Sequence, residues 1–434
     1  MTLAASFLGG ASGRLLPASI TFRFFGAAAA FHVAAWLVLL LTAEQLIRYR
    51  GGLSPAVSAL HLLVLGVLVT TAVGSAAQLL PVATRRALAA HWPVRLVFWM
   101  LIPGITLMCI SMFFVKTRLV AAGAVLTAAG LLTFALILAD NLRRAGSLPV
   151  VAAFGWAALA ALVATALLGP ALSLDYLTHV LDQHQVYARA HAIVAGYGFM
   201  GMLALGFSHV LVPMFALSPA PGRRAAFAGF VAAVGAVVLA AIGVIGDLPG
   251  IVTVASVLGL GAVALHLTLM VRSLKAGMRR RLGLSFILVR AAWIALPASI
   301  LAGFAAYYGH AGPNGPALFG LLLLVGWLLT FLLGILQRIL PFLATMHASS
   351  ARSGTPARVS ELASDSPLKL HAVCHAAAFG LLVFAIVRDE PGPAVLAAWI
   401  GLTGSLAFAF FAANVIRGLL PSPHTPAISH QDAR

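Results

Sequence analysis

Long apolar runs separated by short polar segments occupy the chain from residue 25 to residue 414. Each run is long enough to cross a hydrocarbon layer of about 30 Å as an α-helix. The predicted helices cover residues 25–42, 55–80, 94–115, 119–139, 149–170, 191–216, 225–245, 250–271, 286–308, 314–340, 370–387 and 394–414. The pattern predicts an all-α polytopic membrane protein with twelve transmembrane helices, in one transmembrane domain over residues 1–434.

The composition agrees with this pattern. Hydrophobic residues make up 62% of the chain and charged residues only 9%, whereas soluble domains contain about 45–50% apolar and 25% charged residues. The helices leave no room for a soluble catalytic domain. This excludes most hydrolases and nucleotide-binding proteins, so any chemistry must lie within the bundle or on its rims.

The basic residues predict the orientation. Of the 27 Lys and Arg residues, 21 lie at the termini or in loops after even-numbered helices, and 6 lie in loops after odd-numbered helices. This bias places both termini in the cytoplasm. We therefore interpret the net charge of +17 as an orientation signal and contact with the lipid bilayer, and predict no nucleic-acid partner.

A short motif suggests an internal repeat. The second, sixth and tenth helices each contain a glycine followed, after six residues, by a proline: Gly74 to Pro81, Gly206 to Pro213 and Gly334 to Pro341. The glycines are 132 and 128 residues apart, which predicts three pseudo-repeats of four helices at about residues 25–140, 149–272 and 286–414. The alternative is that the motif is only a packing and helix-end device.

Carboxylates are placed differently from histidines. All ten Asp and Glu residues fall at predicted helix ends or in loops, which argues against ion-coupled transporters and proton pumps. Several of the fourteen histidines lie inside apolar runs. An unpaired imidazole is costly there and needs a partner, and neutral imidazole is a common ligand of heme iron and of transition metals.

His61 and His191 are the leading ligand candidates. Each lies early in an inward-running helix and has a glycine five residues later, so we expect both to face the bundle and to bind heme or a metal. Tyr197 is predicted to add a hydroxyl one or two turns further on. The alternative is a hydrogen bond from each imidazole to a backbone carbonyl or to interfacial water.

Two further groups are candidate metal sites. In the loop before the sixth helix, Asp175, His179 and Asp182 are spaced to share one helical face, with His184 close by. This group predicts an exposed copper or zinc site, or simply a solvated surface. His371 and His375 form an i, i+4 pair that can hold one metal ion.

The helix number, the grouping in fours and the histidines of helices 2 and 6 resemble subunit I of the heme-copper oxidase and nitric oxide reductase superfamily. The segment from His191 to Phe215 looks like reduced relatives of that subunit that occur beside denitrification genes. The resemblance implies that His61 binds a low-spin heme and that His191 binds copper. The heme- and copper-containing NnrS proteins are more distantly similar.

The chain also departs from this superfamily. The predicted helix 225–245 lacks a pair of adjacent histidines for copper, and helix 314–340 lacks the His-x-His ligands of two hemes. We therefore expect no complete oxidase or nitric oxide reductase. We expect a bacterial inner-membrane protein that binds heme, copper or both, and that acts in electron transfer or in nitric oxide or oxygen handling with a respiratory-chain or cytochrome partner. The alternatives are a permease for a small solute or metal, and a structural subunit of a respiratory complex.

Overall fold

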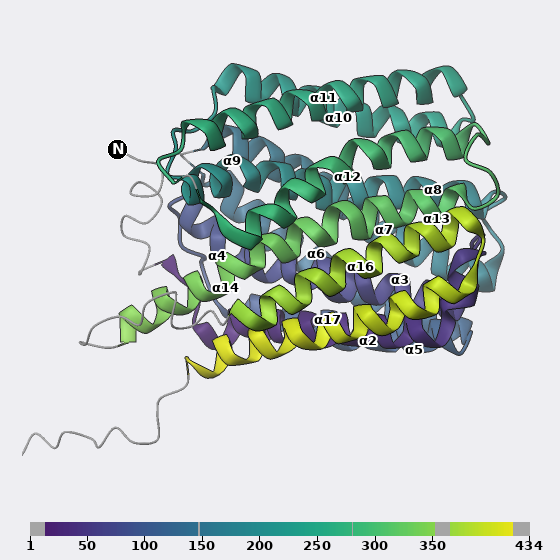
Figure 1. Cartoon of the computed structure of the whole chain (residues 1–434), viewed down its shortest axis with the longest axis horizontal. Helices are drawn as coiled ribbons and strands as arrows, with labels where there is room; N and C mark the ends of the chain where they lie inside the picture. Colours follow the sequence, from purple (N-terminus) through teal and green to yellow (C-terminus); the bar gives the residue numbers. More distant parts are fainter. Residues whose placement is uncertain (1–13, 146–147, 280, 352–364, 420–434) are drawn as a thin grey trace, which may run out of the picture.

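The computed structural model describes residues 14–145, 148–279, 281–351 and 365–419; the predicted loop acid Glu361 and the tail acid Asp432 lie outside these ranges. The described residues contain helices and no strand. Twelve helices are long and apolar enough to cross a membrane, which confirms the all-α polytopic membrane fold (Figure 1). Large apolar side chains such as Leu136, Val231 and Ile294 are exposed, as expected for surfaces that face lipid.

The predicted helices all occur, and each extends beyond its predicted range at one or both ends. Nine spans are single α-helices: α2 (Ala18–Ile47), α5 (Trp92–Phe113), α6 (Thr117–Arg143), α7 (Pro149–Thr178), α10 (Arg223–Ile245), α11 (Pro249–Ala276), α12 (Gly283–Tyr307), α16 (Asp365–Arg388) and α17 (Pro391–Arg417). The other three spans each contain a π-helical segment between two α-helices. They are α3 (Pro55–His61), η2 (Leu62–Val69) and α4 (Thr70–Ala83); α8 (His184–Ile193), η3 (Val194–Gly201) and α9 (Met202–Ala216); and α13 (Gly315–Leu321), η4 (Leu322–Leu329) and α14 (Thr330–Ala351).

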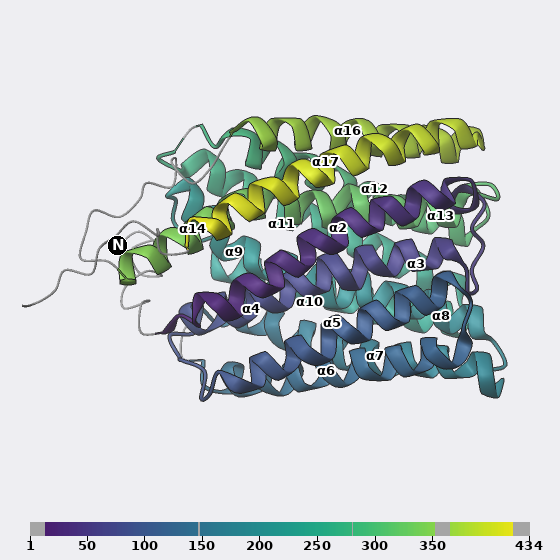
Figure 2. The same cartoon turned by 90° about the horizontal axis from the view of Figure 1, so that it is seen from below.

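The helix contacts follow one pattern three times around the bundle. Antiparallel pairs form between α5 and α6, α10 and α11, and α16 and α17. Each π-helical segment packs on the span before it: η2 on α2, η3 on α7 and η4 on α12. The remaining contacts, α6 with α7, α11 with α12, and α17 with α2, close the bundle (Figure 2). The three-repeat architecture stays a prediction, and this contact pattern supports it.

The three spans with π-helical segments are central. Their most apolar windows are 72%, 83% and 67% buried, whereas the values for the other nine spans are between 11% and 56%. The π-helical segments begin at Leu62, Val194 and Leu322 and therefore have the same intervals of 132 and 128 residues as the glycines of the motif. A hydroxyl stabilises the end of two of them, because Thr70 donates to the Leu65 carbonyl (2.8 Å) and Thr330 to the Val325 carbonyl (2.7 Å).

The glycines of the motif are points of close helix contact. A Cβ added at Gly74 would lie 2.6 Å from the Phe24 Cβ, and one at Gly206 would lie 2.7 Å from the Phe154 Cβ. Only a residue without a side chain fits at this separation. These contacts support the packing interpretation of the motif. The helix-end interpretation fails in the third copy, because α14 continues ten residues beyond Pro341.

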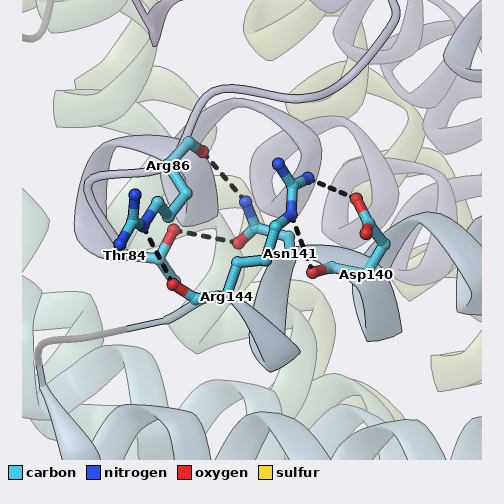
Figure 3. Close-up of polar contacts among 5 residues, drawn as sticks. All are labelled: Thr84, Arg86, Asp140, Asn141 and Arg144. Carbon is cyan, nitrogen blue, oxygen red and sulfur yellow. Dashed lines mark hydrogen bonds and ion pairs between the residues drawn. The ribbon is translucent and has the colours of Figure 1, made fainter.

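A polar seam joins the ends of α4 and α6 on the side predicted to face the cytoplasm (Figure 3). The buried Asn141 side chain accepts a hydrogen bond from the Thr84 hydroxyl (3.0 Å) and donates one to the Arg86 carbonyl (3.0 Å). Arg86 Nε donates to the Arg144 carbonyl (3.0 Å), and Arg144 forms an ion pair with Asp140. The arginines predicted to anchor the topology therefore also connect neighbouring helices.

Candidate functional site

A cavity of about 680 Å³ lies in one half of the bundle, which we name the outer half after the predicted topology. The last central-helix residues that line it are Val69, Leu205 and Leu329, so it ends before the close contacts of Gly74 and its counterparts. Most of its wall is apolar, and none of the Asp and Glu residues that the structure describes lines it. Such a wall suits a largely apolar ligand.

The cavity reaches the outer surface of the bundle. The exposed residues Gln185 and Arg189 lie on its wall, together with Arg50, whose guanidinium donates to the Asn314 Oδ1 (2.7 Å). Tyr49, between α2 and α3, lines the same end, and burial raises the pKa of its phenol to about 12. This end therefore carries fixed positive charge and a neutral phenol.

His61 is held in a defined orientation on the cavity wall. It is the last residue of α3, directly before η2, and its Nδ1 lies 2.9 Å from the Val57 carbonyl. A carbonyl can only accept, so the Nδ1–H of His61 donates and its Nε2 keeps a lone pair. Heme- and metal-binding histidines commonly have this arrangement, because the carbonyl fixes both the tautomer and the ring orientation.

His191, on α8, lines the same cavity. Its Nδ1 is buried and has no hydrogen-bond partner. The ring passes close to α7 at Gly169, where an added Cβ would lie 3.4 Å from the His191 Cε1. The structure thus places two histidines from different spans on the wall of one cavity, and their role as ligands stays a prediction.

The positions of the two histidines in their helices are not equivalent. His61 directly precedes η2, whereas His191 lies three residues before η3 begins at Val194. The glycine that matches Gly66 in this register is Gly198, and not the glycine five residues after His191. The third segment has Gly326 at the same place, so the full motif is glycine, seven residues, glycine, six residues, proline. The sequence contains this longer motif, and the shorter glycine-to-proline pattern alone does not reveal it.

Tyr197 lies on the cavity wall within η3. Its ring stacks on Trp327, with centroids 5.7 Å apart. Its oxygen lies 2.7 Å from Ser299 Oγ, which itself donates to the Leu296 carbonyl (2.7 Å). The Tyr197 O–H therefore donates to Ser299, and the tyrosine is fixed beside the cavity with only its oxygen lone pair free.

The prediction that Asp175, His179 and Asp182 share one helical face is wrong. α7 ends at Thr178 and the following His179 has a φ of 51°, so Asp175, His179 and Asp182 share no helix. Asp175 instead pairs with His184, whose Nδ1 lies 2.8 Å from the Asp175 Oδ2. Asp175 also accepts from the Leu181 backbone N–H (2.7 Å). The carboxylate thus shapes the loop, and the metal role predicted for His179 and His184 stays a prediction.

His371 and His375 are buried on α16, and the structure adds His32 of α2 to them. The ring centroids of His32 and His371 are 6.2 Å apart, and those of His371 and His375 are 5.9 Å apart. A second buried pair, His209 and His266, has centroids 5.4 Å apart. Sequence spacing indicated the His371–His375 pair, but it could not reveal the contacts of His32 with His371 or of His209 with His266, because each of these joins different helices.

The donor sets limit what the site can hold. Within the described ranges, no group of three or more His, Cys, Asp or Glu side chains could hold a metal ion. The cavity wall carries three imidazoles, those of His61, His184 and His191, and the His184 Nδ1 is paired with Asp175. No protein-family model matches this chain, and no curated protein matches it either.

Proposed function

We propose that this protein is a heme-binding membrane protein in which His61 and His191, on the wall of the outer cavity, would hold the heme iron. The observation that carries the proposal is the presence of His61 and His191, from different spans, on the wall of one largely apolar cavity of about 680 Å³. Heme needs only one or two protein ligands. Neutral imidazole also adds no charge to a low-dielectric site.

The donor set fits heme better than copper held by protein alone. The third imidazole on the cavity wall, His184, is paired with Asp175, and no group of three or more His, Cys, Asp or Glu side chains among the described residues could hold a metal ion. The His61 Nε2 has a lone pair that could bind the heme iron. The His191 ring could bind it as well, since its Nδ1 has no hydrogen-bond partner. Copper therefore remains the weaker part of the proposal.

Each residue of the site has a separate task. A bound heme would supply reversible one-electron chemistry, and a coordination position for a diatomic gas if only one of the two histidines binds the iron. Val57 fixes the His61 ring. Ser299 fixes Tyr197, and the apolar wall excludes water. We propose electron transfer, or nitric oxide or oxygen handling, at a bacterial inner membrane with a respiratory-chain or cytochrome partner.

The test is cofactor occupancy. The full chain, purified in mild detergent, is expected to show a Soret band, a pyridine hemochrome spectrum and heme at up to one equivalent. His61→Ala removes the oriented ligand and is expected to abolish most of this absorbance without preventing membrane insertion. His266→Ala, a buried histidine away from the cavity, is the matched control. Unchanged heme content in His61→Ala would overturn the ligand assignment.

A permease is the second candidate, and one observation favours it. The cavity reaches exposed residues at one end and contains no carboxylate from the described residues, which fits a neutral or anionic solute. Protein without any Soret band that takes up solute in proteoliposomes would establish this function and exclude the heme proposal. Protein with neither property would favour the structural subunit.

A further inference from the structure

The outer cavity opens at a group of polar side chains that we name the cavity rim: Arg50, Gln185 and Arg189. All three line the cavity and are exposed. The remainder of the wall is mostly apolar. The proposed function gives the two arginines of the rim no task.

The rim joins two distant parts of the chain. Arg50 lies in the segment between α2 and α3, and Arg189 lies on α8. A Cβ added at Gly51, directly after Arg50, would lie 3.2 Å from the Gln185 Nε2, so this segment packs on Gln185. Gln185 and Arg189 are four residues apart on α8 and therefore lie on one face of that helix. Both arginines thus border the same cavity from neighbouring segments.

The segment that carries Arg50 is fixed by hydrogen bonds. The Tyr49 hydroxyl donates to the Gly52 carbonyl (3.1 Å). The Arg50 guanidinium donates to the Asn314 Oδ1 (2.7 Å) and to the Tyr49 carbonyl (3.4 Å). A guanidinium has five N–H donors, so most of those of Arg50 remain for a ligand.

No carboxylate of the described residues neutralises the rim. No Asp or Glu among them lines the cavity, and their ion pairs include neither Arg50 nor Arg189. Asp389, which accepts from the Asn314 amide (3.3 Å), is paired with Arg48 (3.5 Å). The rim therefore carries two positive charges that an anionic group of a ligand can reach.

The size and the wall of the cavity decide what else that ligand must be. A volume of about 680 Å³ lies within the usual range of small-molecule sites, so a small inorganic anion would leave most of it empty. The apolar wall favours an apolar body, and a carboxylate would be costly there. At the rim, an arginine binds a carboxylate through two parallel hydrogen bonds. A ligand with both parts fits in one orientation only.

We propose that Arg50 and Arg189 form a carboxylate site, so that the cavity takes an amphiphilic carboxylate with its apolar body directed inward. Two kinds of molecule share this chemistry: a porphyrin such as heme, which has two propionates, and a fatty acid. The porphyrin case rests on the proposed function and adds that the propionates of the heme lie at the rim. The fatty-acid case does not depend on heme.

The test measures the affinity of the full chain, produced in heme-deficient cells and purified in a neutral detergent. The ligands are hemin, hemin dimethyl ester, in which both propionates are uncharged, and laurate. The unmodified protein is expected to bind hemin at least about tenfold more tightly than the ester. The double variant Arg50→Gln, Arg189→Gln is expected to lose this preference and to bind the ester normally. Arg48→Gln, at the same end but off the cavity wall, is the matched control and should bind hemin as the unmodified protein does.

The outcomes separate this proposal from the proposed function. Equal affinity of the unmodified protein for hemin and its ester, or unchanged binding of hemin and laurate by the double variant, would overturn the carboxylate site and leave heme binding in place. Laurate binding that depends on the two arginines, without hemin binding, would support the site and overturn the heme proposal. Binding of neither hemin nor laurate would overturn both. The ester comparison uses the unmodified protein, so it does not depend on the folding of a variant.

Discussion

The outer and inner halves of the three central helices differ in packing. The outer halves surround a cavity that ends at Val69, Leu205 and Leu329. The inner halves begin a few residues later with glycines at which neighbouring helices touch. Close contacts also occur in the outer halves, at Gly66 with Phe31 and at Gly198 with Ala161, so the two halves differ in the cavity and not in the presence of close contacts. The comparison teaches that a bundle of nearly uniform hydrophobicity can enclose a cavity over half of its length while the helices that border it stay closely packed against their neighbours.

The histidines of the two halves differ in the same way. His61 and His191 border empty volume, so a ligand can reach their nitrogens. His32 and His371 are buried and do not line the cavity, so a ligand in the cavity does not reach them. Local packing therefore separates the two histidine groups, because residue type and hydrophobic context are alike.

The largest expected effect on stability comes from disrupting the close helix contacts of the inner half. In Gly206→Ala, the new methyl group collides with the Phe154 Cβ, and overpacking of this kind costs about 3 kcal/mol. Gly261→Ala is the control, because an added Cβ there meets nothing within 4 Å. Thermal unfolding in detergent measures both. Equal midpoints for the two variants would contradict the description of the inner half as closely packed.

A smaller loss is expected from the polar seam. Asn141→Ala removes a buried amide together with its hydrogen bonds to Thr84 and to the Arg86 carbonyl, which costs about 2 kcal/mol. Asp140→Asn removes only the exposed ion pair with Arg144 and should cost between about 0 and 1 kcal/mol. The same unfolding assay compares them, and a larger effect of Asp140→Asn would show that the ion pair and not the amide joins the helices.

The smallest effect on stability is expected in the outer half. Gly320 lines the cavity, and an added Cβ there meets nothing within 4 Å. Gly320→Leu should therefore change the free energy of unfolding by no more than about 0.5 kcal/mol. Its side chain takes up cavity volume, so heme content should fall. Gly250→Leu, at an open position off the cavity wall, is the control, and equal heme content in both would place the heme elsewhere.

The sequence predicted the twelve helices because each apolar run is long enough to decide its own structure. It also predicted that His61 and His191 face the bundle. It could not predict the π-helical segments, since η2, with the sequence LLVLGVLV, reads as ordinary α-helix. It wrongly placed Asp175 and His179 on one helical face because the left-handed residue that ends α7 has no glycine or proline signal. The contact of His32 with α16 depends on packing between distant spans.

The π-helical segments also set the rotation of one half of a helix relative to the other half. An α-helix turns by about 100° per residue, and one extra residue shifts all positions beyond it by that angle. The outer and inner halves of each central span are therefore set at independent rotations about one axis. A single-residue deletion within Val194–Gly201 would keep the inner contact of Gly206 and turn His191 about 100° away from the cavity. Substitutions near the π-helical segments thus keep the rotation of the helix. Insertions or deletions within these segments instead rotate all side chains of the outer half.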